Sequence, residues 1–146
     1  MNIKIYSRNE IIKLSKAQFD SNTALISIYD TDDVPPKITN KPQYTLFVAF
    51  DDVYADDMDE VNLDFFKPFD EKLAKRIAQF IMRHQDDVDT FICQCQFGQS
   101  RSAGVAAAIK EYFDGEGRGV FNDNRYSPNI KVYNLLVNQL RKEDIK

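Results

Sequence analysis

The segment from Cys95 to Ser102, C-Q-F-G-Q-S-R-S, brings together a sulfur, a glycine and an arginine. It lies between an apolar run, T-F-I-C, and a second one, A-G-V-A-A-A-I. These runs predict a buried strand followed by a helix, so the loop between them gathers backbone N–H groups at the positive end of a helix dipole. Such a loop binds anions and favours the thiolate, the nucleophilic form of cysteine. We therefore predict that Cys95 is a nucleophile beneath an anion site.

Two further residues of this loop suit phosphate. Gly98 allows backbone conformations that a side chain would forbid, and the planar guanidinium of Arg101 can hold two oxygens at once. The predicted phosphate-binding residues are Gln96, Phe97, Gly98, Gln99, Ser100 and Arg101. No lysine follows the second glycine of G-Q-S-R-S-A-G, so this is not the phosphate loop of nucleoside triphosphatases.

The apolar patterns along the chain alternate between strand and helix. Strands are expected at 2–6, 23–29, 43–50 and 89–94, and helices at 8–17, 69–84 and 102–113. A break is expected at 115–119, and a last helix with Ser127 as its cap and Pro128 at its first position. The alternation predicts an α/β fold with a central, mainly parallel twisted sheet of four to five strands flanked by helices. We expect a single domain over 1–146.

Composition excludes several classes of function. The net charge is −4, which argues against a nucleic-acid partner. No apolar run approaches the roughly 20 residues of a membrane-spanning helix, and the polar N-terminus is no signal peptide. The two cysteines, Cys93 and Cys95, do not form a secreted disulfide framework, and Cys93 is expected to be core. We expect a cytoplasmic protein with a strongly acidic segment at 51–60.

Cysteine, five residues, arginine and serine at 95–102 resemble the signature loop of the cysteine-dependent protein tyrosine phosphatases. G-Q-S-R-S is similar to the dual-specificity branch, and F-D-D at 50–52 is similar to the general-acid segment W-P-F-D-D of the phosphatases of regenerating liver. The tail Y-S-P-N-I-K-V-Y-N-L-L-V-N-Q-L resembles the closing helix of many dual-specificity enzymes. The resemblance covers about the last two thirds of the chain. It departs at Gln94, where the family has histidine, and at 53–67, which lengthens the interval between acid and nucleophile.

The resemblance implies a protein tyrosine phosphatase-like fold and a phosphocysteine intermediate on Cys95. Arg101 and the amides of 96–101 would hold the phosphate oxygens, Asp52 or Asp51 would protonate the leaving group, and Ser102 would donate a hydrogen bond to the sulfur. No metal or cofactor is implied. The substrate would be a phosphorylated protein or a small phosphomonoester: phosphotyrosine and, in the dual-specificity branch, phosphoserine and phosphothreonine.

Three alternatives remain open at this point. Asp51 and Asp52 could equally be caps at a strand end. The protein could be a catalytically weak phosphate-binding module, that is, a pseudophosphatase. The same chemistry could also act on a phosphoinositide, a nucleotide or an RNA 5′-phosphate.

Overall fold

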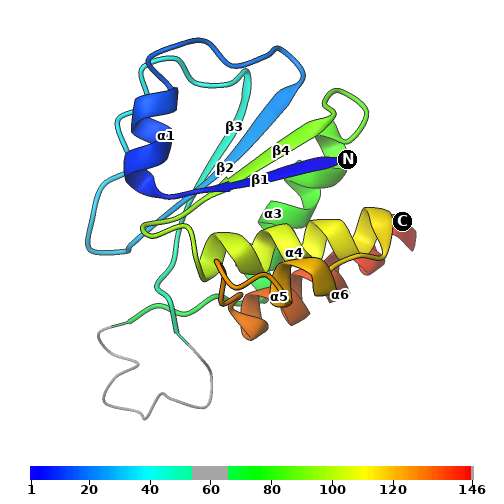
Figure 1. Ribbon diagram of the computed structural model, residues 1–146. Helices are drawn as coiled ribbons and strands as arrows, with labels where there is room; N and C mark the ends of the chain where they lie inside the picture. The colour runs from blue at the N-terminus through cyan, green and yellow to red at the C-terminus, as the bar shows by residue number, and fades with distance from the viewer. Residues whose placement is uncertain (54–65, 146) are drawn as a thin grey trace.

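The computed structural model describes residues 1–53 and 66–145, and within them the chain forms a four-stranded sheet (Figure 1). The strands are β1 (Asn2–Tyr6), β2 (Thr23–Tyr29), β3 (Tyr44–Ala49) and β4 (Thr90–Gln94). Their order is β1-β4-β2-β3, and every neighbouring pair is parallel. The predicted α/β class with a mainly parallel sheet of four to five strands is therefore confirmed.

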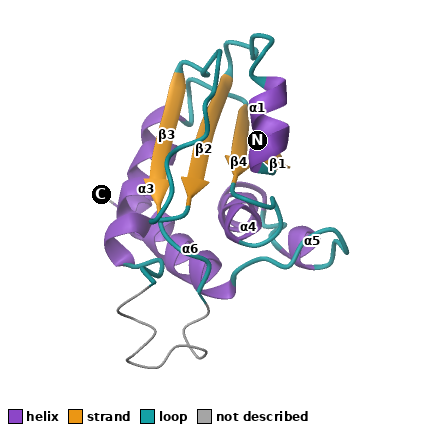
Figure 2. Ribbon diagram, turned by 90° about the vertical axis from the view of Figure 1, so that its left-hand side faces the viewer, coloured by secondary structure: helices purple, strands orange, loops and turns teal. Residues whose placement is uncertain are grey.

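Helices cover both faces of the sheet. On one face lies α1 (Arg8–Leu14), whose Ile11 packs against Leu25 and Ile92. On the other face lie α3 (Glu71–His84), α4 (Arg101–Asp114) and α6 (Ile130–Ile145), as Figures 1 and 2 show. Residues of β2 and β4 alternate between these two faces, so both central strands are buried along nearly their whole length and are mostly apolar.

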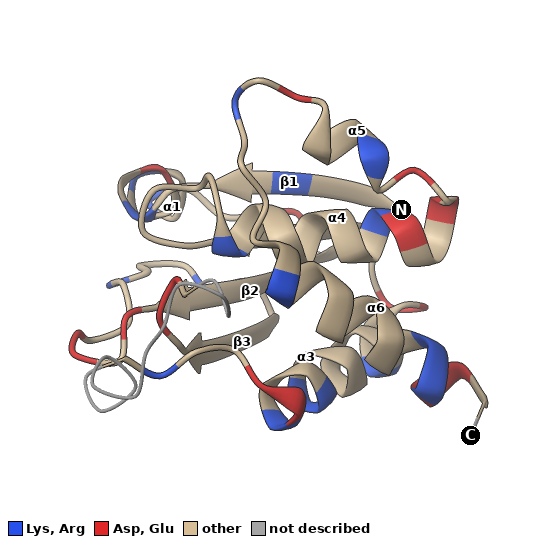
Figure 3. Ribbon diagram, turned by 90° about the horizontal axis from the view of Figure 1, so that it is seen from below, with Lys and Arg blue, Asp and Glu red and all other residues tan. Residues whose placement is uncertain are grey.

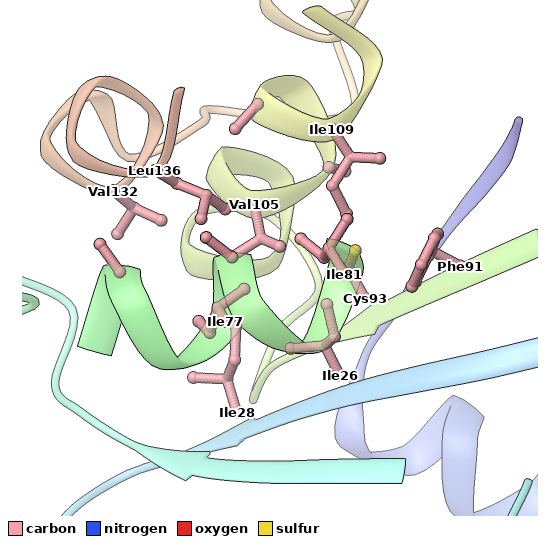
Figure 4. Packing of buried hydrophobic residues seen from close by; sticks show 14 of the residues in the cluster. Ile26, Ile28, Ile77, Ile81, Phe91, Cys93, Val105, Ile109, Val132 and Leu136 are labelled. Atoms are coloured by element: carbon pink, nitrogen blue, oxygen red, sulfur yellow. The ribbon is translucent and has the colours of Figure 1, made fainter. Parts of the chain in front are cut away.

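The larger core lies between the sheet and α3, α4 and α6. Figure 4 shows Ile26 and Phe91 from the strands meeting Ile77 and Ile81 of α3 and Val105 of α4. The run of alanines in α4 is fully buried, which allows this helix to pass close to the sheet. Burial of this kind contributes about 25 cal/mol per Å² of apolar surface and holds the loops at the sheet edge in fixed positions.

The parallel arrangement determines where the functional residues meet. Because all strands point the same way, the segments that follow β2, β3 and β4 leave from one edge of the sheet. These segments begin at Asp30, Phe50 and Cys95. The candidate acid and the candidate nucleophile therefore share an edge, although the acid precedes the nucleophile by more than forty residues in the sequence.

Two local expectations differ from the structure. A short helix, α5 (Arg118–Phe121), starts inside the expected break at 115–119, because Val120 packs against Ala103 and Ala107. The cap of α6 is Asn129 rather than Ser127: its Oδ1 accepts hydrogen bonds from the amides of Lys131 and Val132 at 3.1 and 3.2 Å.

No helix in the described parts is both long and apolar enough to cross a membrane. Most of the acidic segment 51–60 lies outside the described residues.

Candidate active site

Cys95 is the first residue after β4, and its position is set by the neighbouring strand. Its amide donates a hydrogen bond to the carbonyl of Tyr6 at 3.3 Å, and its Sγ lies 3.0 Å from Oγ of Ser102. The side chain is 2% exposed, with the sulfur directed at the start of α4. Cys93, two residues earlier, faces the core (Figure 4), and burial raises the pKa of its thiol.

The turn of the loop requires the glycine at 98. Gly98 has a φ of +67°, and a Cβ on it would come within 2.7 Å of the amide nitrogen of Ser7 and 2.8 Å of the carbonyl carbon of Tyr6. The loop is thus pressed against the junction between β1 and α1. Phe97, just before the glycine, is 75% exposed and stands at the rim of the loop.

The carbonyls and the amides of this loop are used differently. Three carbonyls accept hydrogen bonds from backbone amides outside the loop: Gln96 from Arg8 at 3.1 Å, Gln99 from Ser127 at 2.8 Å and Ser100 from Asn129 at 3.0 Å. In contrast, the amides of 96–99 donate to no residue in the described part of the chain. A turn whose carbonyls are engaged and whose amides are available is an anion-binding concavity.

The guanidinium of Arg101 is buried at 4% exposure and partly engaged. Its Nη1 donates to Oδ1 of Asp30 at 2.6 Å and to the carbonyl of Phe50 at 2.8 Å. Its Nε is the one buried side-chain polar atom in the described regions that has no hydrogen-bond partner. A buried charged donor left unpaired costs free energy, and Nε is one of the donors that an arginine directs at an oxyanion. The site therefore holds a fixed cationic donor suited to a phosphate oxygen.

The two adjacent aspartates have different surroundings. Asp51 is buried, and its carboxylate accepts hydrogen bonds from the amide and hydroxyl of Thr31 at 3.0 and 2.7 Å and from the amide of Lys67 at 2.8 Å. Burial opposes its ionisation, but these hydrogen bonds and the charge of Arg101 outweigh it and lower the pKa of Asp51. Asp51 is thus a bound carboxylate that ties two loops together.

Asp52 is exposed, and its carboxylate reaches the loop at 95–101. Its Oδ1 accepts hydrogen bonds from Oγ of Ser100 at 2.8 Å and from Nδ2 of Asn129 at 2.9 Å. Its Oδ2 accepts none from the residues that the structure describes. One carboxylate oxygen is anchored and the other has no donor among the described residues, which is the arrangement of a positioned acid or base.

Asn129 is a residue of the site that the sequence analysis did not single out. It is 1% exposed, and besides capping α6 it donates to Asp52 and to the carbonyl of Val53 at 3.2 Å. The S-P-N pattern of the tail marked the start of a helix, but a contact 77 residues distant leaves no local signal.

Gln94 also supports the loop. It is fully buried; its Nε2 donates to the carbonyl of Cys95 at 3.1 Å, and its Oε1 accepts from the hydroxyl of Ser27. The amide thus occupies the position directly before Cys95 with both of its polar ends hydrogen-bonded. It is neutral at every ordinary pH, so any charge that stabilises the sulfur must come from elsewhere in the loop.

A small cavity of about 190 Å³ adjoins the loop and is acidic. Its lining residues are Asp30, Thr31, Asp32, Asp51, Asp52 and Phe66. In the described residues no group of histidine, cysteine and carboxylate side chains is arranged to hold a metal ion. The aspartates that line the cavity form a negatively charged wall beside the guanidinium of Arg101.

Comparisons with known proteins identify the architecture. No protein-family model matches the chain, and no curated protein matches it. Among solved structures, Tk-PTP in its active form matches with a TM-score of 0.55 at 13% identity, over 97% of this chain and 93% of that one. PTPMT1 in complex with PI(5)P matches with a TM-score of 0.54 at 12% identity, over 99% and 93%.

A third match is a human tyrosine phosphatase-like serine/threonine/tyrosine-interacting protein, with a TM-score of 0.51 at 17% identity, over 86% of this chain and 78% of that one. At these identities the likeness is one of fold. The chain has the α/β fold of the protein tyrosine phosphatases, with Cys95 at the carboxyl end of a central strand.

Proposed function

We propose that the protein is a cysteine-dependent phosphatase that hydrolyses phosphomonoesters through a phosphocysteine intermediate. The observation that carries the proposal is the donor set around Cys95: the unpaired, buried Nε of Arg101 and the amides of 96–99. Hydrogen-bond donors arranged in advance supply most of the stabilisation in phosphoryl transfer. The fold shared with protein tyrosine phosphatases supports the same chemistry.

In the first step the Sγ of Cys95 attacks phosphorus, and the bond from phosphorus to the leaving oxygen breaks in line with the new one. Arg101 and the loop amides hold the three equatorial oxygens. The hydroxyl of Ser102, 3.0 Å from the sulfur, donates a hydrogen bond that stabilises the thiolate before attack and again when the phosphocysteine breaks down.

The proton for the leaving oxygen comes from Asp52. Its anchored Oδ1 fixes the carboxyl group, and Oδ2 carries the proton. In the second step the same group, now ionised, takes a proton from the water that attacks the phosphocysteine. Asp51 does not fill this role, because its oxygens are occupied and its lowered pKa keeps it ionised.

The substrate that this site fits best is a phosphorylated tyrosine of a protein, with phosphoserine and phosphothreonine as further candidates. The exposed rings of Phe97 and Phe66 offer apolar contact to an aromatic leaving group. The acidic wall that includes Asp32 and Asp52 disfavours polyanions, since like charges repel strongly near a protein surface. This argues against a phosphoinositide, although PTPMT1 is seen with PI(5)P.

We also propose a cytoplasmic location and no nucleic-acid partner. Cys93 and Cys95 are both free thiols, which suits a reducing compartment. The negative net charge opposes binding to a nucleic-acid backbone.

Hydrolysis of para-nitrophenyl phosphate tests the proposal. Cys95→Ser should lower kcat/KM by about 10⁴-fold or more, because it removes the nucleophile. Cys93→Ala, a change two residues earlier and inside β4, should leave activity within about threefold of the wild type, since this thiol lies in the core. Turnover by Cys95→Ser at the wild-type rate would refute the mechanism.

The alternative is a phosphate-binding module with little turnover. Gln94 in place of histidine favours it, as does the fold shared with the serine/threonine/tyrosine-interacting protein. In that case wild-type protein would bind vanadate, Arg101→Ala would abolish this binding, and wild type would hydrolyse the aryl phosphate no faster than Cys95→Ser.

A further inference from the structure

A second and larger cavity, of about 870 Å³, opens on the opposite side of β1 from β4. None of the loop residues 95–102 lines it. It lies between β1, the end of α4 and α5, and we call it the β1–α5 groove. Its lining residues are Ile3, Lys4, Ile5, Tyr6, Lys110, Gly115, Glu116, Arg118, Gly119, Val120, Asp123, Arg125 and Tyr126.

One wall of the groove is the open edge of the sheet. β1 pairs only with β4 among the described strands, and in this parallel ladder the backbone groups of Asn2, Lys4 and Tyr6 face β4. The amides and carbonyls of the alternate residues, Ile3 and Ile5, therefore face outward into the groove. An edge of this kind is a template for one more extended strand.

The opposite wall is held in place by a close contact between α4 and the segment before α5. Gly117 is buried, and a Cβ there would lie 2.9 Å from the carbonyl oxygen of Ala107. The segment can approach α4 only without a side chain at this position. Gly119, two residues further, has open space around it and lines the groove.

The groove is basic on an acidic protein. Four cations line it against two carboxylates, an excess of two positive charges where the whole chain carries −4. Arg125 and Asp123 neutralise each other at 2.8 Å, which leaves three cations, Lys4, Lys110 and Arg118, against one carboxylate, Glu116. Figure 3 shows basic positions on both β1 and α5, the two elements that face each other across the groove.

We propose that the β1–α5 groove binds an extended acidic segment of a partner protein as an added strand on β1. Backbone groups of the segment would pair with Ile3 and Ile5, and its carboxylates would meet Lys4, Lys110 and Arg118. The site is independent of the proposed phosphatase chemistry, since no step requires Cys95.

Two other occupants fit less well. A second copy of the chain, added edge to edge, would bring one basic groove against another. A nucleic acid would find only two excess charges and would leave the outward amides and carbonyls of Ile3 and Ile5 without complementary backbone groups.

The test is a titration of a fluorescein-labelled octapeptide of alternating glutamate and valine with the full chain. The anisotropy of the peptide should saturate below about 1 mM protein. Amide NMR shifts should change at 3–6 and 115–126 and not along α3, at 71–84. Lys4→Glu combined with Lys110→Glu should weaken binding about tenfold or more. Gly119→Trp should do the same by filling the groove, at a position where its Cβ meets no other atom within 4 Å.

The matched control is Lys72→Glu combined with Lys75→Glu, which reverses two exposed charges on α3. It should change affinity less than about twofold. Both double variants should hydrolyse para-nitrophenyl phosphate like the wild type, so that a failure of the phosphatase proposal is seen separately.

Four outcomes would overturn the proposal: no saturation up to about 1 mM, equal weakening by the control, equal affinity for a lysine–valine peptide or for octauridylate, and concentration-dependent dimerisation through β1. The last would assign the edge to a second copy of the chain.

Discussion

The loop at 95–101 carries the proposed nucleophile, and the acid segment at 50–53 carries the proposed acid; they lie at the same edge of the sheet but are held in different ways. The loop is fixed by backbone contacts, from its carbonyls to neighbouring amides and from Gly98 to the end of β1. In the acid segment the backbone of Phe50 and Asp51 is also paired, but Asp52 itself is fixed by side chains, those of Ser100 and Asn129.

This difference separates two properties of the site. Backbone contacts tolerate many side-chain substitutions. The loop at 95–101, with its anion-binding amides, should therefore keep its conformation through most changes around it. The position of the acid depends on a few individual side chains, and each of them can be removed singly. Anion binding and proton transfer should therefore respond to different sets of mutations.

Replacing Arg101 should have the largest effect among changes outside the nucleophile. Arg101→Lys keeps the charge but loses Nε and the planar fork, so kcat/KM for an aryl phosphate should fall about 10³-fold. Arg125→Lys, on the surface and paired with Asp123, is the control and should have no effect. A loss below tenfold would show that the loop amides alone bind the oxyanion.

Asp52→Asn should come next, with a loss of about 10²-fold on substrates with poor leaving groups, at the lower end of what general acids contribute. The variant should also become more sensitive to the acidity of the leaving phenol, because the departing oxygen is no longer protonated. A series of substituted phenyl phosphates measures both effects. If the rate depended on the acidity of the leaving phenol in the same way for the variant and the wild type, Asp52 would not be the general acid.

Asn129→Ala should lower kcat about tenfold by releasing the Oδ1 of Asp52. It should also cost about 1 kcal/mol of unfolding free energy, since it removes the cap of α6. The double variant with Asp52→Asn distinguishes the two effects: the loss of stability should remain, while the loss of kcat should shrink below about twofold. Fully additive losses in kcat would contradict a role through Asp52.

Asp51→Asn should change activity least and stability most clearly. Replacing the carboxylate breaks hydrogen bonds from Thr31 and Lys67, which should cost about 1–3 kcal/mol at neutral pH. The pKa of Asp51 in the folded protein lies below its usual value of 3.8, so its stabilisation is complete above that value and is lost as pH falls through the lowered one.

Urea unfolding of wild type and Asp51→Asn at neutral and acidic pH measures this dependence. The difference between the two proteins should shrink on acidification. A constant difference would mean that the charge of Asp51 contributes nothing.

The fold was predictable because its signals are local. Each strand of the sheet was placed within about a residue, since apolar runs such as T-A-L-I-S-I-Y and T-F-I-C-Q are read directly from the sequence. The helix α5 was missed because G-R-G-V-F has poor helix propensity. It forms only through the packing of Val120 on α4.

The parts of the site that escaped prediction all depend on contacts distant in sequence. Asp30 is 71 residues from Arg101 and reaches it only because β2 lies beside β4. Likewise, the resemblance at F-D-D favoured Asp52 over Asp51 as the acid only narrowly. The three hydrogen bonds to Asp51 and the contacts of Asp52 with Ser100 and Asn129 distinguish them.

A crystal structure with orthovanadate tests the central claim most directly. The account predicts vanadium bonded to Sγ of Cys95, with equatorial oxygens accepting hydrogen bonds from Nε of Arg101 and the amides of 96–99, and with Asp52 facing the apical oxygen. Vanadate found elsewhere, or a sulfur with no oxyanion above it at saturating vanadate, would contradict the account.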